Sequence, residues 1–138
     1  VVWVSGEPET PSAPGHYAFV SGSDSGALAL WHAGKKRPVR SEHHCPGRPI
    51  LSLATPSHPS DTIVSGSDDG WVRVWRVHTE PGNHALEPIN ALPVPGSINA
   101  LAINEDLLVV AVSGEPRNGR WTVCSDIKPT VLVFRRQS

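Results

Sequence analysis

The sequence has no methionine and no long hydrophobic run. The longest unbroken apolar segment in its 138 residues is the six-residue run at 107–112. A membrane-spanning helix needs about 20 such residues, so the sequence argues against one. No basic segment followed by an apolar one, the pattern of a secretory signal, opens the chain. We expect a piece of a longer protein that does not cross a membrane.

Cysteine is scarce, and the charge is nearly balanced. Cys45 and Cys124 lie 79 positions apart and form neither a CxxC pair nor the multi-cysteine framework of small secreted domains. We therefore favour a reducing compartment, with a Cys45–Cys124 disulfide as the alternative. Twelve Lys and Arg residues oppose 13 Asp and Glu residues, which gives a net charge of −1. This balance argues against a basic fragment that coats nucleic acid.

Motifs for enzymatic chemistry are also missing. The segment 22–26 has Asp24 where a nucleophile elbow needs serine. Ala29 stands where a phosphate-binding loop ending at Gly34-Lys35 would need glycine, and no dinucleotide-binding fingerprint occurs. We expect no catalytic residues, no cofactor and no small-molecule substrate.

Residue types that bind zinc gather between positions 43 and 58. They are His43, His44, Cys45 and His58, and their spacing matches no recognised zinc motif. The prolines around them indicate a surface loop. We therefore expect no metal site.

Glycine and proline, by contrast, are abundant, and one segment is repeated. The 12 Gly and 14 Pro residues indicate many turns and short elements. Segment 19–31 (FVSGSDSGALALW) and segment 63–75 (IVSGSDDGWVRVW) agree at seven of thirteen positions, with an offset of 44 residues. Each copy predicts a β-hairpin: an apolar strand, a Ser-Gly-Ser-Asp turn and an alternating strand that ends in Trp. We expect Gly26 and Gly70 to supply the positive φ of the turn.

A third, weaker copy completes an all-β pattern of about three four-stranded antiparallel blades. Its strands are predicted to begin at Leu107 and to cover 120–123. Inner strands are predicted at 1–4, 50–53 and 98–103, and outer strands at 38–41, 85–91 and 131–134. The period of 44 residues is typical of propeller blades, which we place at 1–47, 48–96 and 97–138. Because a closed propeller has about four to eight blades, we expect further blades N-terminal to these.

Blades of this length, with a Ser-x-Asp turn and a closing Trp, resemble the WD-repeat family over nearly the whole chain. The resemblance implies a β-propeller in which a buried set of hydrogen-bonded Asp, Ser and Trp residues pins each blade. The candidates for these structural pins are Trp31 in the first copy and Ser65 or Ser67, Asp69 and Trp75 in the second. The first copy has Ser25 where Asp is expected. The Gly-His dipeptide that usually completes the set is absent at its expected place.

Segments 21–38 and 97–121 are similar to the C-terminal blades of WD-repeat proteins of the U-three small nucleolar ribonucleoprotein. The features that carry this similarity lie outside the generic repeat: Lys35-Lys36-Arg37-Pro38 after the first closing Trp, and 114–121, which ends in Arg117-Asn118-Gly119-Arg120-Trp121. This resemblance implies a non-catalytic scaffold protein that is located in the nucleus, in the nucleolus. It would bind U-three small nucleolar RNA and small-subunit processome proteins, for pre-ribosomal RNA processing and small ribosomal subunit biogenesis. The alternative is a WD-repeat adaptor that binds protein partners only.

Several basic side chains and one tryptophan are candidate contacts for RNA or for a protein partner. They are Lys35, Lys36, Arg37, Arg40, Trp71, Arg117 and Arg120. Trp71 begins its strand beside the second turn, where a partner could reach it, whereas the other tryptophans occupy predicted core positions. Basic clusters can contact RNA phosphates independently of sequence. A solvated surface is the alternative explanation for both clusters.

Overall fold

The computed structural model describes residues 2–4, 18–32, 35–56, 61–80, 82–114 and 128–137. Every regular element among these residues is a β-strand, which confirms the all-β prediction. In this described part, no helix reaches the length and hydrophobicity of a membrane span.

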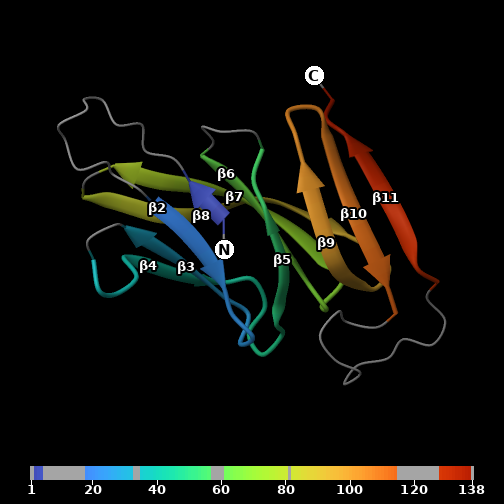
Figure 1. The fold of residues 1–138 in the computed structure, drawn as a ribbon, viewed down its shortest axis with the longest axis horizontal. Coiled ribbons are helices and arrows are strands. Elements are labelled where there is room, and N and C mark those ends of the chain that lie inside the picture. Colours follow the sequence, from blue (N-terminus) through green and yellow to red (C-terminus); the bar gives the residue numbers. More distant parts are fainter. Residues whose placement is uncertain are drawn as a thin grey trace.

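The strands form three antiparallel sheets. They are β1 (Val2–Val4), β2 (Ala18–Gly22), β3 (Ala27–His32), β4 (Arg40–His43), β5 (Ile50–Ala54), β6 (Thr62–Ser67), β7 (Trp71–Glu80), β8 (Asn83–Pro93), β9 (Ser97–Ile103), β10 (Leu107–Ser113) and β11 (Thr130–Arg135). The first sheet has the order β1-β2-β3-β4, the second β5-β6-β7-β8 and the third β9-β10-β11. Figure 1 shows the blue first sheet on one side of the molecule and the orange and red third sheet on the other.

The two repeat copies form the predicted hairpins, β2–β3 and β6–β7. The turn glycines Gly26 and Gly70 have φ values of 86° and 80°, as the turn chemistry predicts. The predicted inner strands correspond to β1, β5 and β9, and the first two outer strands to β4 and β8. The repeat therefore predicted the local structure of the first two sheets well.

The prediction for the last strand of the third sheet was wrong. Segment 131–134 was expected as a fourth, outer strand, but β11 pairs directly with β10, with Leu108 opposite Phe134 and Val110 opposite Leu132. This pairing brings Leu132 and Phe134 against the apolar cluster between the second and third sheets. The strand predicted at 120–123 lies outside the described residues.

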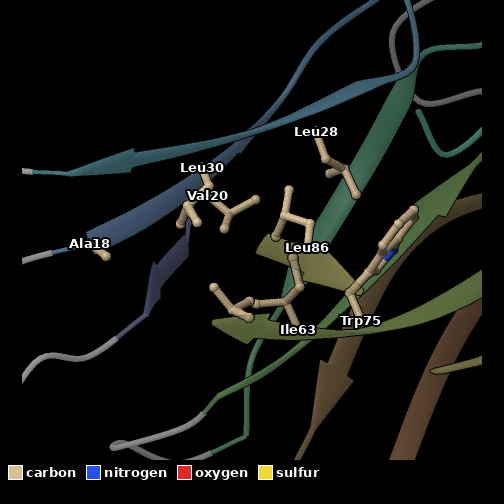
Figure 2. Close-up of a cluster of buried hydrophobic side chains, with 8 residues drawn as sticks. Ala18, Val20, Leu28, Leu30, Ile63, Trp75 and Leu86 are labelled. Carbon is tan, nitrogen blue, oxygen red and sulfur yellow. The ribbon is translucent and has the colours of Figure 1, made fainter. Parts of the chain in front are cut away.

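The second sheet is buried on both faces. Along β6, Ile63 packs with side chains of the first sheet, and the next residue, Val64, packs with side chains of the third. Figure 2 shows the first of these clusters, in which Leu28 and Leu30 of β3 face Ile63, Trp75 and Leu86. Because successive strand residues point to opposite faces, continuous burial along β6 means that both faces are covered.

Among the described residues, only one face of the third sheet is covered. Along β10, burial alternates: Leu108, Val110 and Val112 are buried against the second sheet, and the residues between them are only half-buried. On β11, Val131 and Val133 are 64% and 61% exposed. An apolar surface therefore lies on the far side of this sheet, next to the edge strand that is red in Figure 1.

Two glycines of the repeated Ser-Gly-Ser segment allow neighbouring sheets to approach closely. A Cβ atom on Gly22 would lie 2.5 Å from Ile50 Cγ2, and a Cβ atom on Gly66 would lie 2.4 Å from Ile98 Cγ2. Ile50 begins β5 and Ile98 lies in β9, so each glycine admits the inner strand of the following sheet. The glycine in both copies therefore has a packing role that the turn does not explain.

Candidate functional site

A histidine from the end of the first sheet enters the interior of the second. His44 follows β4 directly and is only 3% exposed. Its Nδ1 lies 2.7 Å from Ser65 Oγ on β6, and its Nε2 lies 3.2 Å from Asp69 Oδ1 in the β6–β7 turn. The Trp75 indole Nε1 donates a hydrogen bond of 2.9 Å to the same Ser65 Oγ. These four side chains form a continuous chain of hydrogen bonds, which we call the buried tetrad.

The hydrogen bonds of the buried tetrad run from the Trp75 indole to the Asp69 carboxylate. The Trp75 N–H donates to Ser65 Oγ, and the Ser65 hydroxyl is also hydrogen-bonded to His44 Nδ1. On the other side of the ring, His44 Nε2 is hydrogen-bonded to Asp69 Oδ1. Both ring nitrogens of the buried histidine therefore have partners, as buried polar groups require.

Asp69 is the only charged end of this chain, and its environment favours the ionised form. Burial by itself raises its pKa. The hydrogen bond from His44, the attraction of His44, the Trp71 backbone N–H at 3.0 Å and the nearby Arg73 charge outweigh burial, so the pKa of Asp69 lies below its ordinary value of 3.8. A carboxylate therefore holds the turn in place at neutral pH.

The prediction of a surface loop around His44 was wrong, because its side chain is buried. His44 lies 31 residues before Trp75 and follows another histidine in place of the expected glycine. The buried tetrad uses Ser65 and not Ser67, whose hydroxyl only approaches Asp68 at 3.5 Å. Both serines lie on the same face of β6 as Ile63, the partner of Trp75, but Ser65 is the next residue on that face and Ser67 is one step further away. The strand pairing would therefore have favoured Ser65.

The first copy repeats half of this arrangement. Trp31 Nε1 donates to Ser21 Oγ at 2.9 Å, and these positions are the equivalents of Trp75 and Ser65 at the offset of 44 residues. Ser25, at the position of Asp69, bonds to the Ser23 hydroxyl at 2.8 Å. Ser21 was another residue that the repeat alone could have identified.

The predicted basic contacts fall in three different settings. Lys35, Lys36 and Arg37 are exposed in the connection between β3 and β4. Arg40 is also exposed, but its Nε donates to the backbone carbonyl of His84 on β8 at 2.9 Å, so it ties the first sheet to the second. Arg117 and Arg120 lie outside the described residues.

Trp71, the aromatic candidate, lies at the start of β7 beside the Asp69 turn and is 39% exposed. The guanidinium carbon of Arg73 lies over its indole, 5.9 Å from the ring centroid. Across the turn, Arg48 lies 3.5 Å from Asp68. We call Arg48, Trp71 and Arg73 together the turn surface.

The residues of zinc-binding type between positions 43 and 58 lie in different surroundings. Both ring nitrogens of His44 are engaged in the buried tetrad. Within the described ranges, no group of three His, Cys, Asp or Glu residues is arranged to hold a metal ion. His58 and Cys124 lie outside those ranges, and Cys45 is half-buried with a free thiol.

Comparison with known proteins agrees with this geometry. The family "WD domain, G-beta repeat" matches residues 36–76, which include all four members of the buried tetrad. The WD40 repeats of RRP9 superpose with a TM-score of 0.73 at 29% identity, over 86% of this chain and 39% of that one. The chain belongs to the WD-repeat family. The structure of U3-55K is similarly close, with a TM-score of 0.75 at 29% identity and the same coverage.

Two relatives of known sequence carry names that refer to U3. U3 snoRNP-associated protein-like EMB2271 of Arabidopsis thaliana is 37% identical over 120 residues, which is 75% of this chain and 25% of the relative. U3 small nucleolar RNA-interacting protein 2 of Mus musculus is 34% identical over 127 residues, 84% of this chain and 26% of the relative. The chain thus spans about a quarter of the length of these relatives.

The matched WD repeat does not coincide with one sheet. Residues 36–76 include β4, the outer strand of the first sheet, and β5, β6 and β7 of the second. His44 lies just after β4, and the other three members of the buried tetrad lie in the second sheet and its β6–β7 turn. The repeat therefore connects two sheets, and the buried tetrad lies where they join.

Proposed function

We propose that this chain is part of a non-catalytic scaffold in a U3 small nucleolar ribonucleoprotein. In this role it contributes to binding U3 small nucleolar RNA and processome proteins in the nucleolus, for pre-ribosomal RNA processing. The observation that carries the proposal is the similarity to proteins named for U3 association over 75% to 84% of the chain. The similarity to the RRP9 and U3-55K structures supports the same role.

The geometry supports a mechanism in which a rigid frame presents fixed loops. The second sheet is packed on both faces, and side chains also link the sheets. Arg40 joins the first sheet to the second, and Ser52 Oγ accepts the Leu101 N–H at 3.0 Å to join the second to the third. Loops on such a frame lose little conformational entropy on binding, because they are already positioned.

The loop at Lys35, Lys36 and Arg37 is the basic surface that we assign to RNA phosphates. Backbone bonds fix both of its ends: Lys35 N–H donates to His32 O at 3.1 Å, and Val39 N–H donates to Leu30 O at 2.8 Å. All three side chains remain exposed. Contacts of this kind add salt-dependent affinity without reading sequence. Arg117 and Arg120 remain proposed contacts of the last blade.

The test is purification of the full-length protein from cell extract, followed by sequencing of the bound RNA. We expect strong enrichment of U3 small nucleolar RNA that survives moderate salt. The triple variant K35E/K36E/R37E should lower this enrichment and reduce the salt dependence of binding. The matched control is K128E/R135E/R136E, which reverses three exposed charges in the third sheet.

Two outcomes would count against the proposal. Recovery of proteins with no RNA above background would contradict it and favour a WD-repeat adaptor that binds protein partners only. An equal loss of RNA in both triple variants would show that net charge, and not the loop at 35–37, determines binding.

A further inference from the structure

The turn surface carries an exposed aromatic ring that the buried tetrad does not use. The exposed large apolar residues in the described ranges are Trp71, Ile89, Val131 and Val133, and Trp71 is the only aromatic one. Trp75, four residues later on the same strand, is only 3% exposed. Strand packing therefore does not account for the exposed indole of Trp71.

The position of Trp71 is fixed by the buried tetrad. Its backbone N–H donates to Asp69 Oδ1 at 3.0 Å, and the same oxygen receives the His44 hydrogen bond. Trp71 also pairs with Pro93 on β8. Because the turn is held from the interior, the backbone that carries the ring is fixed before any ligand arrives, which lowers the entropic cost of binding.

The electrostatics of the turn surface indicate the class of ligand. The Asp68 and Asp69 side chains are only 6% and 9% exposed and face Arg48 and His44, respectively. Arg48 is 46% exposed, and the Arg73 Nε is buried without a hydrogen-bond partner. The acidic groups are therefore largely hidden, and the exposed indole has a cationic side chain, Arg73, against its ring.

Such a surface suits a nucleotide better than a basic peptide. Arg73 already occupies a cation position over the indole, so a lysine or arginine of a partner would meet a like charge there. An unpaired base can stack on the remaining ring surface, and its phosphates are attracted to the arginines.

We propose that Trp71 is the stacking platform for one unpaired base of the bound RNA, with Arg73 and Arg48 attracting the adjacent phosphates. This inference rests on the proposed RNA-binding function and assigns a separate contact from the loop at 35–37. It predicts that binding depends on single-stranded nucleotides at this contact, because bases in a duplex are already stacked.

The experiment measures the affinity of full-length protein for U3 small nucleolar RNA made by transcription in vitro. We expect W71A to weaken binding about 5- to 150-fold, and W71F to retain most of it, because loss of one stacked base costs about that factor. R73Q should reduce the slope of log Kd against log salt by about one, and W71A should leave this slope unchanged. The control I89A, which removes another exposed apolar side chain, should bind like wild type.

The outcomes separate this inference from the proposed function. If wild type does not bind the RNA, the proposed function fails. If wild type binds and W71A binds equally well, only the stacking inference is overturned. If W71A loses a co-purifying protein and keeps the RNA, the turn surface is a protein contact, which also overturns it. Unchanged thermal unfolding of W71F and R73Q would show that a loss of affinity is not a loss of fold.

Discussion

Ser65 is the residue on which the buried tetrad depends most. It accepts from Trp75 Nε1 and is hydrogen-bonded to His44 Nδ1, so its hydroxyl satisfies two buried nitrogens. Replacement by alanine would leave both nitrogens without this partner, and each such group costs about 1–3 kcal/mol.

We therefore expect S65A to lower the free energy of unfolding, measured by urea denaturation, by more than S67A does. Ser67 is buried to the same extent but makes only a 3.5 Å approach to Asp68, so it is a matched control. Equal losses in the two variants would mean that the tetrad contributes nothing beyond ordinary packing.

Asp69 should make stability depend on pH in the acid range. Its pKa is lowered in the folded protein, so folding favours the carboxylate. The resulting stabilisation is present above the unfolded pKa and is lost as the pH falls through the folded pKa. We expect the urea concentration at the unfolding midpoint of wild type to decrease as the pH is lowered from about 5 to about 3. The midpoint of D69N should be lower than that of wild type at pH 5 and should change less over this range.

The control for this measurement is D61N, which removes a carboxylate that is 67% exposed and lies 3.7 Å from Arg76. Its pH profile should follow wild type. A D69N profile parallel to that of wild type would contradict the assigned role of the carboxylate.

Some of these residues could be found from the sequence, and others could not. Trp75 and the turn glycines recur in the repeated hairpin, and Asp69 lies in its turn at the position where the WD-repeat pattern has Asp, so short-range pattern identifies them. His44 lies 21 residues before Ser65 and in another sheet, and it lacks the preceding glycine of the familiar motif. Only the packing of one sheet on the next shows that its ring is buried.

At the scale of elements, β6 and β9 approach closely at Gly66. An added Cβ would meet Ile98 Cγ2 at 2.4 Å, a distance that requires a shift of the strand. We expect G66A to destabilise the protein by about 1–3 kcal/mol, as overpacking does.

A double-mutant cycle with I98A measures this contact. Ile98 is fully buried, so I98A is itself destabilising, but G66A should cost less in that background because the clashing methyl is gone. If the effects of the two substitutions on the free energy of unfolding are additive, the cost of G66A does not arise from the contact with Ile98.

The third sheet shows why the order of strands in a sheet cannot always be predicted from the sequence. Residues 131–134 are all apolar, and such a run fits a third strand as well as a fourth, because it indicates burial and does not show which strand lies beside it. The pairing of Leu108 with Phe134 decides the order, and it joins segments more than 20 residues apart. Pairing over such distances is set by packing of the whole sheet.

At the scale of the whole molecule, the apolar far side of the third sheet should promote self-association of the 138-residue chain. Val131 and Val133 are largely exposed beside an edge strand, and such edges can pair with another chain. Sedimentation velocity should show association that grows with concentration.

We expect V131K/V133K to reduce this association, because edge lysines oppose pairing. The control T130K/Q137K adds the same charge at exposed positions that are not apolar. Monomeric behaviour of wild type at all concentrations, or equal effects of the two double variants, would contradict this role of the valines.

The position of His44 also affects how the molecule can be divided. Cleavage of the chain between β4 and β5 would separate the first sheet from the second and leave every strand of the second sheet intact. The same cut removes the ring that joins Ser65 to Asp69. Loss or fraying of the first sheet should therefore weaken the turn that carries Trp71 in the second, so neighbouring sheets should unfold together and not one at a time.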